Sequence, residues 1–202
     1  MTSFSTQPEY CAVILAAGYS SRMQRQKFGL DFSEKKIFLD QIIGNLKNAG
    51  CAHVEVVINK DGWALIENIN YKVPDNTSFT INNFPEKGRF YSLKIALANI
   101  PCNSPVLIHN VDNPFINQNV ILALLKSIDG YDYVYPVFKG KGGHPVLVSK
   151  KMAIRIKEEE NCGYNIKSFL RKFNGKSVEV DNDSILININ TPEDYKKYFG
   201  MN

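Results

Sequence analysis

The stretch YCAVILA at residues 10–16 decides the fold, and it runs directly into Ala17 and Gly18. A continuous apolar run of this length is typical of a strand buried on both faces of a parallel sheet. Apolar residues at helical spacing follow over residues 37–49, and a glycine marks the end of that helix. A second apolar run, HVEVVI at residues 53–58, predicts another strand. Strand, helix and strand in this order predict a parallel sheet with right-handed crossovers.

The alternation of strands and helices continues along the chain and loosens toward its C-terminal part. Further strands are expected at 78–82, 105–109, 133–138, 145–148, 177–180 and 185–189, and further helices at 63–69, 91–100, 120–128, 149–160, 164–173 and 192–199. Two of these strands flank a glycine-rich connection at residues 140–143, which predicts a small antiparallel part. We therefore expect a three-layer α/β/α, Rossmann-like fold with a mostly parallel sheet. It is expected to form a single domain over residues 10–202, after a disordered lead-in at residues 1–9.

Length and composition exclude several protein classes. The 202 residues are 44% hydrophobic and 22% charged, as in an average soluble globular protein, which excludes a disordered tail, a collagen-like fibre and a disulfide scaffold. The four cysteines (Cys11, Cys51, Cys102 and Cys162) form no C-x-x-C pair, which argues against structural zinc and favours reduced thiols. No apolar stretch approaches the roughly 18 residues of a membrane span, and the N-terminus resembles no signal peptide. A cytoplasmic protein without a membrane partner is expected.

The charge pattern and the fold class together indicate what kind of ligand to expect, and where. The net charge of +4 is mild, and acidic residues accompany the basic ones along the chain. No nucleic-acid partner is required by this pattern, whereas small phosphorylated molecules fit it. In open α/β sheets, ligands bind outside the carboxyl ends of the strands. Chemistry is therefore expected in the breaks after residues 16, 58 and 109.

The segment LAAGYSSRM at residues 15–23 is the most informative part of the chain. Small residues let the backbone approach a ligand, Gly18 permits a positive φ, and backbone N–H groups with the serine hydroxyls can cradle phosphate oxygens. Arg22 and Lys27 supply two cations that suit phosphate. A plain strand-to-helix turn with a serine cap and two solvated cations is the alternative. No G-x-G-x-x-G follows the strand, and GKS at residues 175–177 lacks the first glycine of a P-loop, so neither of those phosphate motifs fits.

Residues 15–27 resemble the L-A-A-G-x-S-x-R-M-G-x-x-K signature of the MobA-like nucleotidyltransferases. The spacing to Lys27 is kept, while Gln24 stands where the family has glycine. These enzymes transfer a nucleoside monophosphate from an NTP to a phosphorylated acceptor and release pyrophosphate, so the resemblance implies the same reaction here. It also implies a nucleotide-binding nucleotidyltransferase fold in which the loop cradles the NTP phosphates while two cations counter their charge. The residues concerned are Leu15, Ala16, Ala17, Gly18 and Ser20, with Arg22 and Lys27 as the cations.

The segment NVDNPF at residues 110–115 resembles the family's D-x-P-F motif. The resemblance implies that Asp112 holds Mg²⁺, and a hard carboxylate oxygen suits an ion that also binds waters and substrate phosphates. From the residues alone, an Asp just before a Pro is more often a turn former or a helix cap. Val111 departs from the glycine that is common in the family before this Asp.

Three further positions are similar to family positions that contact the nucleotide. Gly88 and Ser92 match a G-x-x-x-S segment that lies along the nucleotide, although a plain helix N-terminus would look the same. Asn59 follows the second strand, where related enzymes place polar contacts to the base. An asparagine in a turn is the equal alternative for Asn59.

Two segments in the last third of the chain bear on the acceptor. GGHPVLV at residues 142–148 resembles a segment of the cytidylyltransferase branch, which implies acceptor-side positioning by His144. NINTPED at residues 188–194 resembles the family's closing segment, and its last four residues make a helix cap by themselves. Asn188 and Asn190 are expected to face the same way along a strand and to contact Mg²⁺ or the acceptor phosphate.

Two features favour cytidylyl transfer, and one favours guanylyl transfer. The L-A-A-G form of the loop and the segment around His144 resemble cytidylyltransferases, whereas Asn188 and Asn190 match the guanylyl pattern. We expect CTP as the donor and a phosphorylated small molecule as the acceptor, with molybdopterin as the leading candidate. The acceptor phosphate would attack the α-phosphorus directly, because a phosphate monoester needs no general base near neutral pH. Open alternatives are a sugar or polyol phosphate as acceptor, a non-catalytic nucleotide-binding module and a nucleic-acid-binding protein, and the oligomeric state stays open.

Overall fold

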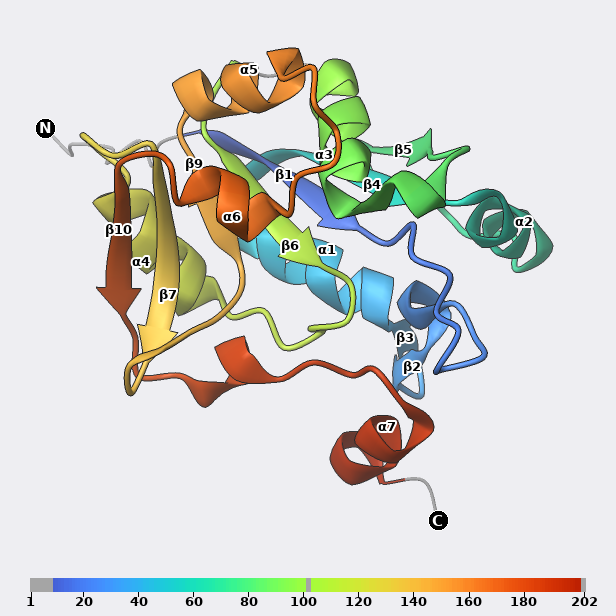
Figure 1. Cartoon of the computed structure of the whole chain (residues 1–202). Helices are drawn as coiled ribbons and strands as arrows, with labels where there is room; N and C mark the ends of the chain where they lie inside the picture. The colour runs from blue at the N-terminus through green and yellow to red at the C-terminus, as the bar shows by residue number, and fades with distance from the viewer. Residues whose placement is uncertain (1–8, 101–102, 201–202) are drawn as a thin grey trace, which may run out of the picture.

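The computed structural model describes residues 9–100 and 103–200, which form an eight-stranded mixed sheet flanked by helices (Figure 1). The strand order is β10-β7-β9-β6-β1-β4-β5, with β8 paired to β7. The strands are β1 (Tyr10–Leu15), β4 (Cys51–Ile58), β5 (Thr77–Ile81), β6 (Val106–Asn110), β7 (Tyr133–Phe138), β8 (Lys141–Gly142), β9 (Val146–Val148) and β10 (Gly175–Glu179). Parallel pairing joins β6, β1, β4 and β5, and also β7 and β10, whereas β9 runs antiparallel to β6 and β7. The predicted mostly parallel sheet with a small antiparallel part is therefore confirmed.

Helices cover both faces of the sheet and complete the three layers. One face carries α1 (Phe38–Asn48), α2 (Lys60–Asn68) and α4 (Gln118–Ser127), and the other carries α3 (Gly88–Asn99), α5 (Lys150–Glu158) and α6 (Ile166–Leu170). Alternate residues of β1 enter the two cores, since Ala12 and Ile14 pack on the first face while Val13 and Leu15 pack on the second. Burying such a side chain contributes about 1.5–3 kcal/mol, which is why the whole of β1 is apolar.

A third, smaller hydrophobic cluster holds the C-terminal helix α7 (Pro192–Phe199) beside the β2 (Asp31–Ser33) and β3 (Lys36–Ile37) hairpin. The ring of Phe199 stacks on that of Phe115 at 5.5 Å between centroids. The predicted cap at the start of α7 is confirmed, because the N–H of Asp194 donates to Oγ1 of Thr191 at 3.2 Å and the Asp194 carboxylate accepts in return. Three short 3₁₀ helices complete the elements: η1 (Lys27–Gly29), η2 (Pro85–Lys87) and η3 (Asp183–Leu186).

The strand predicted at residues 185–189 is wrong. The segment forms η3 and then an irregular stretch that crosses the molecule toward α7 (Figure 1). Its apolar alternation comes from contacts with two different clusters, since Ile185 packs in the main core and Ile189 in the cluster around α7. The N–H of Ile189 donates to the carbonyl of Asp112 at 2.7 Å instead of joining a strand ladder.

Three other sequence expectations concern the cysteines, membrane spans and the N-terminal lead-in. Cys11 is disulfide-bonded, so the expectation that all four thiols are reduced is wrong at that position, whereas Cys51 and Cys162 are free thiols. Within the described ranges, the helices are too short and too polar to cross a membrane. The lead-in predicted at residues 1–9 lies outside the described residues except for Glu9.

Candidate functional site

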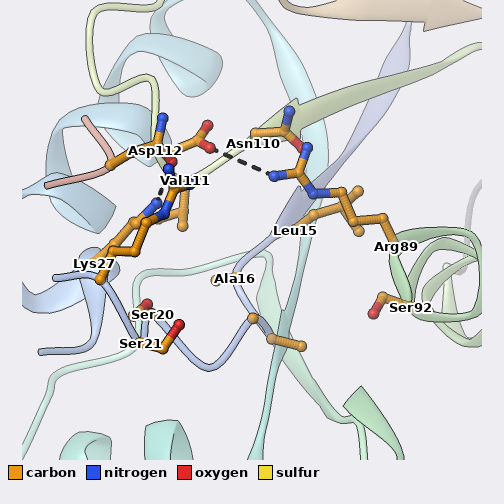
Figure 2. Close-up of a pocket in the computed structure, with 14 residues that line it drawn as sticks. Leu15, Ala16, Ser20, Ser21, Lys27, Arg89, Ser92, Asn110, Val111 and Asp112 are labelled. Carbon is orange, nitrogen blue, oxygen red and sulfur yellow. Dashed lines mark hydrogen bonds and ion pairs between the residues drawn. The ribbon is translucent and has the colours of Figure 1, made fainter. Parts of the chain in front are cut away.

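A cavity lies where β1 and β6 end side by side. Leu15 pairs in parallel register with Asn110, so the loop after β1 and the turn after β6 leave the sheet at the same edge. Between them lies a space of about 210 Å³, which we call the small cavity (Figure 2). The predicted site residues that line it are Leu15, Ala16, Ala17, Gly18, Ser20, Arg22, Lys27, Ser92, Asp112 and Asn190. A cavity therefore lies at the carboxyl ends of these strands, where the sequence predicts a ligand.

The loop after β1 is shaped by two residues in the left-handed region. The N–H groups of Met23 and Gln24 both donate to the carbonyl of Ser20 at 2.9 Å, and Ser20 and Gln24 adopt φ angles of 51° and 57°. Gly18 permits a positive φ but does not adopt one. A Cβ at Gly18 would meet no atom within 4 Å, so the backbone there faces open space that a ligand can occupy. The φ of 57° at Gln24 explains why the family has a glycine at this position, since glycine adopts a positive φ without strain.

Asp112 is a buried carboxylate in the turn after β6, with 6% of its surface exposed. Nη2 of Arg89 lies 3.6 Å from Oδ2 of Asp112, while Oδ1 is buried and has no hydrogen-bond partner in the described part of the chain. The turn itself is closed by Asn113, whose Oδ1 accepts from the N–H of Phe115 at 3.1 Å. The alternative for Asp112 was a turn-forming residue, but it is the side chain of Asn113 that makes the hydrogen bond of this turn. Buried carboxylate oxygens normally contact a cation or a hydrogen-bond donor, and Oδ1 of Asp112 has neither in the described chain.

This carboxylate fits a divalent ion that substrate helps to hold. The described residues contain no group of three or more His, Cys, Asp or Glu side chains that could bind a metal by themselves. Mg²⁺ typically binds through one or two carboxylates, and waters and substrate phosphates fill its other positions. The unpartnered Oδ1 of Asp112 meets that requirement on the protein side.

Lys27 reaches the small cavity from η1 and is half-buried. Its Nζ donates to Oδ1 of Asn190 at 2.7 Å, which joins two positions 163 residues apart in the chain. Burial lowers the pKa of Lys27 below its ordinary value, the charge of Asp112 opposes that shift, and Arg22 and Arg89 add to it. An ammonium group that has lost part of its hydration gains more from an anionic ligand than one in bulk water.

The segment before α7 holds the two charged residues in place. The N–H of Ile189 donates to the carbonyl of Asp112, and the carboxylate of Asp194 accepts from the N–H of Asn190 at 2.9 Å. Asn188 lies outside the small cavity, is exposed, and donates to the carbonyl of Leu186. The two asparagines are therefore not equivalent, and Asn190 serves Lys27.

Asn59 and Ser92 make hydrogen bonds within the protein. Asn59 caps α2, since its Oδ1 accepts from the N–H of Gly62 at 2.8 Å, and its Nδ2 donates to the carbonyl of Ala17 at 3.3 Å. Asn59 does not line the small cavity, and its hydrogen bond to Ala17 holds the loop after β1. These contacts are structural, as in the alternative of an asparagine in a turn. Ser92 lines the cavity, and its hydroxyl accepts from Nδ2 of Asn82 at 2.9 Å.

A second space of about 760 Å³, which we call the large cavity, adjoins the first. Arg89 and Asn110 line both cavities, so they form the wall between them. The predicted residues Gly88 and His144 line the large cavity and not the small one. Nε2 of His144 lies 3.0 Å from Nδ2 of Asn110, and burial lowers the pKa of His144, so the neutral imidazole accepts this hydrogen bond.

Basic side chains and aromatic rings line the large cavity. Tyr133 and Tyr135 line it, and their rings stack at 6.0 Å between centroids with 19° between planes. Its described lining includes no acidic residue, whereas four basic residues contribute: Lys87, Arg89, Lys167 and Arg171. Such a surface suits a ligand that combines negative charge with a flat ring.

Sequence reasoning missed Arg89 and Asn110 as site residues. Both stand inside segments that resemble the family, GRFYS at residues 88–92 and NVDNPF at residues 110–115. A basic residue next to a helix start and an amide two positions before Asp112 were the available signals. Neither motif assigns a role to these positions, so only the folded geometry brings them between the two cavities.

Comparison with known proteins places the chain in a family. Residues 12–178 match the MobA-like NTP transferase domain. The chain is 29% identical over 185 residues to the molybdenum cofactor cytidylyltransferase of Escherichia coli (strain K12), which covers 91% of this chain and 92% of the relative. It is 30% identical over 198 residues to the "Probable molybdenum cofactor guanylyltransferase" of Clostridium perfringens (strain 13 / Type A), which covers 92% of this chain and 93% of the relative.

Solved structures agree on the fold. Rv0371c from Mycobacterium tuberculosis H37Rv superposes with a TM-score of 0.77 at 19% identity, and 98% of each chain is covered. Its complex with manganese gives a TM-score of 0.73 at 17% identity, covering 94% of this chain and 97% of the other. The predicted fold class is thereby confirmed. The loop after β1, the cations Arg22 and Lys27 and the carboxylate of Asp112 line one cavity, and residues 12–178 match the family model, so the chain belongs to the family of MobA-like nucleotidyltransferases.

Proposed function

We propose that this protein transfers CMP from CTP to a phosphorylated small molecule, with molybdopterin as the acceptor, and releases pyrophosphate. One observation carries the proposal: the open backbone loop, two cations and one carboxylate oxygen without a partner line the same small cavity. Nucleotidyl transfer needs positioning and charge stabilisation far more than it needs a covalent residue. The small cavity offers those two things.

The donor phosphates would bind along the loop after β1. Ala17, Gly18, Ser20 and Ser21 line the small cavity together with Arg22 and Lys27, and a Cβ at Gly18 would meet no atom within 4 Å. Arg22 can grip a phosphate with two parallel hydrogen bonds, while Lys27 acts as a point charge that Asn190 holds in place. These groups would stabilise the charge that grows on the leaving pyrophosphate.

Asp112 is the residue proposed to hold Mg²⁺, through the Oδ1 atom that has no partner in the described chain. When bound, the ion supplies positive charge shared between the carboxylate and the triphosphate. The manganese complex of Rv0371c supports a divalent ion in a protein of this fold. The choice of Mg²⁺ over Mn²⁺ rests on the resemblance of residues 110–115 to the family motif.

The proposed reaction is a direct displacement at phosphorus. An oxygen of the acceptor phosphate forms a new bond to the α-phosphorus of CTP, and the bond from that phosphorus to the bridging oxygen of the β-phosphate breaks. The bonding electrons leave with pyrophosphate, which the loop and the two cations retain as an anion. The acceptor phosphate is already ionised near neutral pH, so the protein needs no general base.

The large cavity is the proposed acceptor site. It adjoins the small cavity through Arg89 and Asn110, so an acceptor phosphate placed at this wall would face the α-phosphate of the donor. Four basic residues suit an anion, and the Tyr133–Tyr135 pair suits a planar ring such as a pterin. A sugar or polyol phosphate would use the cations and leave the rings without a partner.

Competition binding tests the donor. A fluorescent nucleotide bound to the protein with Mg²⁺ should be displaced by CTP at a concentration at least tenfold below that needed for GTP, because a site that hydrogen-bonds one base leaves groups unpaired with another. The guanylyltransferase among the relatives makes GTP the rival donor. Displacement by GTP at equal or lower concentration contradicts cytidylyl transfer and favours guanylyl transfer.

A second measurement separates an enzyme from a non-catalytic nucleotide-binding module. Pyrophosphate release from CTP is followed with molybdopterin and with a panel of sugar and polyol phosphates as acceptors. The proposal expects acceptor-dependent release with molybdopterin above all others. Tight CTP binding without release on any acceptor would identify a binding module, and release only with a sugar phosphate would replace the acceptor.

A further inference from the structure

Arg89 occupies an unusual place between the two cavities. It stands in the first turn of α3, lines both cavities, and reaches across to Asp112, as Figure 2 shows. Its side chain is 65% exposed, whereas that of Asp112 is 8% exposed. In this ion pair the exposed side chain of Arg89 is free to change its rotamer, whereas the buried side chain of Asp112 is held in place by its surroundings.

We infer that Arg89 is a movable clamp: it covers the carboxylate of Asp112 in the free protein, and it turns to the acceptor phosphate in the large cavity once a divalent ion takes its place. The inference rests on the proposed function and deepens it. It assigns to Arg89 a role that neither the family motifs nor the relatives assign.

Competition for one carboxylate is the first step. Oδ2 of Asp112 faces Arg89 at 3.6 Å, while Oδ1 has no partner in the described chain. A divalent ion on this carboxylate brings two positive charges within a few ångströms of the guanidinium, and like charges at that distance repel. The charge of Asp112 acts on Lys27, and Arg22 and Arg89 both lower the pKa of Lys27, so positive charge already gathers around this carboxylate. Arg89 is the side chain paired with Asp112 and is 65% exposed, so it is the one that can leave.

The large cavity gives Arg89 its second position. Lys167 and Arg171 line that cavity with it, and no acidic side chain in the described lining competes for its charge. A guanidinium binds phosphate through two parallel hydrogen bonds, which a lysine cannot do. Movement of Arg89 away from Asp112 therefore frees the metal site and completes the acceptor site in one step.

A plain surface ion pair is the alternative, and it predicts different results. Exposed pairs contribute little to stability, so Arg89→Ala should leave the thermal midpoint close to that of the wild type under either view. The clamp predicts that removal of Arg89 strengthens metal binding and weakens phosphate binding, whereas a surface ion pair without function predicts no change in either. The two ligands are a metal alone and a phosphate alone, which require no catalytic turnover.

The metal arm uses Mn²⁺ without nucleotide, followed by electron paramagnetic resonance on the wild type, Arg89→Ala, Arg89→Lys and Lys151→Ala. Arg89→Ala should bind Mn²⁺ roughly two- to fivefold more tightly than the wild type, because its competitor is gone. Arg89→Lys should stay close to the wild type. Lys151 is exposed on α5 and lines neither cavity, so Lys151→Ala controls for the loss of one positive charge. Equal Mn²⁺ affinity in Arg89→Ala and Lys151→Ala overturns the inference.

The phosphate arm uses inorganic phosphate as the probe, by phosphorus NMR line broadening at saturating CTP and Mg²⁺. Arg89→Ala should weaken phosphate binding by about tenfold or more, and Arg89→Lys by less, because a lysine restores charge without the paired hydrogen bonds. Unchanged phosphate affinity in Arg89→Ala overturns the clamp. Failure of the wild type to bind CTP at all would instead contradict the proposed function, so the two failures are distinguishable.

Discussion

The small cavity, of about 210 Å³, takes most of its lining from one loop and one turn, whereas the large cavity, of about 760 Å³, takes its lining from segments spread over residues 87–171. The loop of the first is rich in small residues, whose backbone a ligand can approach, whereas large aromatic and basic residues line the second. A site made of backbone recognises what every NTP shares, namely its phosphates. A site made of side chains from many elements can be altered one residue at a time.

Under the proposed function, this contrast explains how the acceptor can change while the donor site stays the same. Substitutions at Tyr135 or Lys167 in the large cavity leave the loop of the small cavity untouched, because the described linings of the two cavities share only Arg89 and Asn110. The contrast also makes separate predictions for the two cavities.

The largest expected effect is that of Asp112→Asn in the small cavity. Turnover should fall by roughly 10²–10³-fold or more, because a neutral amide cannot anchor the divalent ion. The thermal midpoint should change little, since Oδ1 of Asp112 has no hydrogen-bond partner within the described fold and the backbone carbonyl that accepts from Ile189 is kept. Pyrophosphate release and a thermal melt check the two parts. More than a few per cent of the wild-type rate in a folded Asp112→Asn would reduce Asp112 to a structural residue.

Lys27→Ala and Arg22→Ala should come next, with a loss of about 10²-fold in kcat/KM for CTP. Calorimetry should show that CTP loses more affinity than cytidine, because both cations are proposed to contact phosphate. Arg25→Ala is the matched control, since Arg25 lies in the same loop, is exposed and does not line the small cavity. Equal losses for CTP and cytidine would show that Lys27 and Arg22 do not read phosphate.

Lys167→Ala and Tyr135→Ala probe the large cavity and should leave CTP affinity unchanged. KM for the acceptor should rise about tenfold in each, because one removes a charged hydrogen-bond donor and the other a stacking ring. Steady-state kinetics at saturating CTP measures this. The contrast between the two cavities fails if either variant weakens CTP as much as it weakens the acceptor.

The pH dependence should distinguish Lys27 from an ordinary lysine. Because burial lowers its pKa, Lys27 loses its proton at a lower pH than a solvated lysine, so kcat/KM for CTP should fall as the pH rises through that value. In Lys27→Arg, the side chain keeps its charge and this alkaline fall should disappear, at a reduced overall rate. An alkaline limb that persists unchanged in Lys27→Arg belongs to another group.

The smallest expected effect concerns the shape of the loop in the small cavity. Gln24→Gly should raise the free energy of unfolding by up to about 1 kcal/mol and the thermal midpoint by about 2–4 °C, because φ is 57° at Gln24 and glycine adopts that angle without strain. Gln24→Ala is the control, since alanine removes the side chain and keeps the strained angle. A melt in which both variants shift equally would exclude backbone strain as the cause.

The small cavity was largely predictable from the sequence, and the large one was not. Residues 15–27 are contiguous, and Asp112 follows a strand that must neighbour β1, so the parallel sheet brings the two together. The motif predicts His144 on the acceptor side, but the motifs assign no role to Arg89 or Asn110, which stand out only because the start of α3 and the end of β6 border both cavities. The strand expected at 185–189 failed because its apolar residues serve two separate clusters, which periodicity alone does not reveal.

The hydrogen bond between Lys27 and Asn190 also sets an order in time. The two residues lie 163 positions apart, so at a synthesis rate of about 5–20 residues per second, roughly 8–30 s separate their appearance in a growing chain. During that interval the loop after β1 already exists, yet Lys27 still lacks its hydrogen bond to Asn190. A nascent chain can therefore form most of its sheet before the proposed phosphate site is complete. Under the proposed function, activity appears late in synthesis, with the segment that precedes α7.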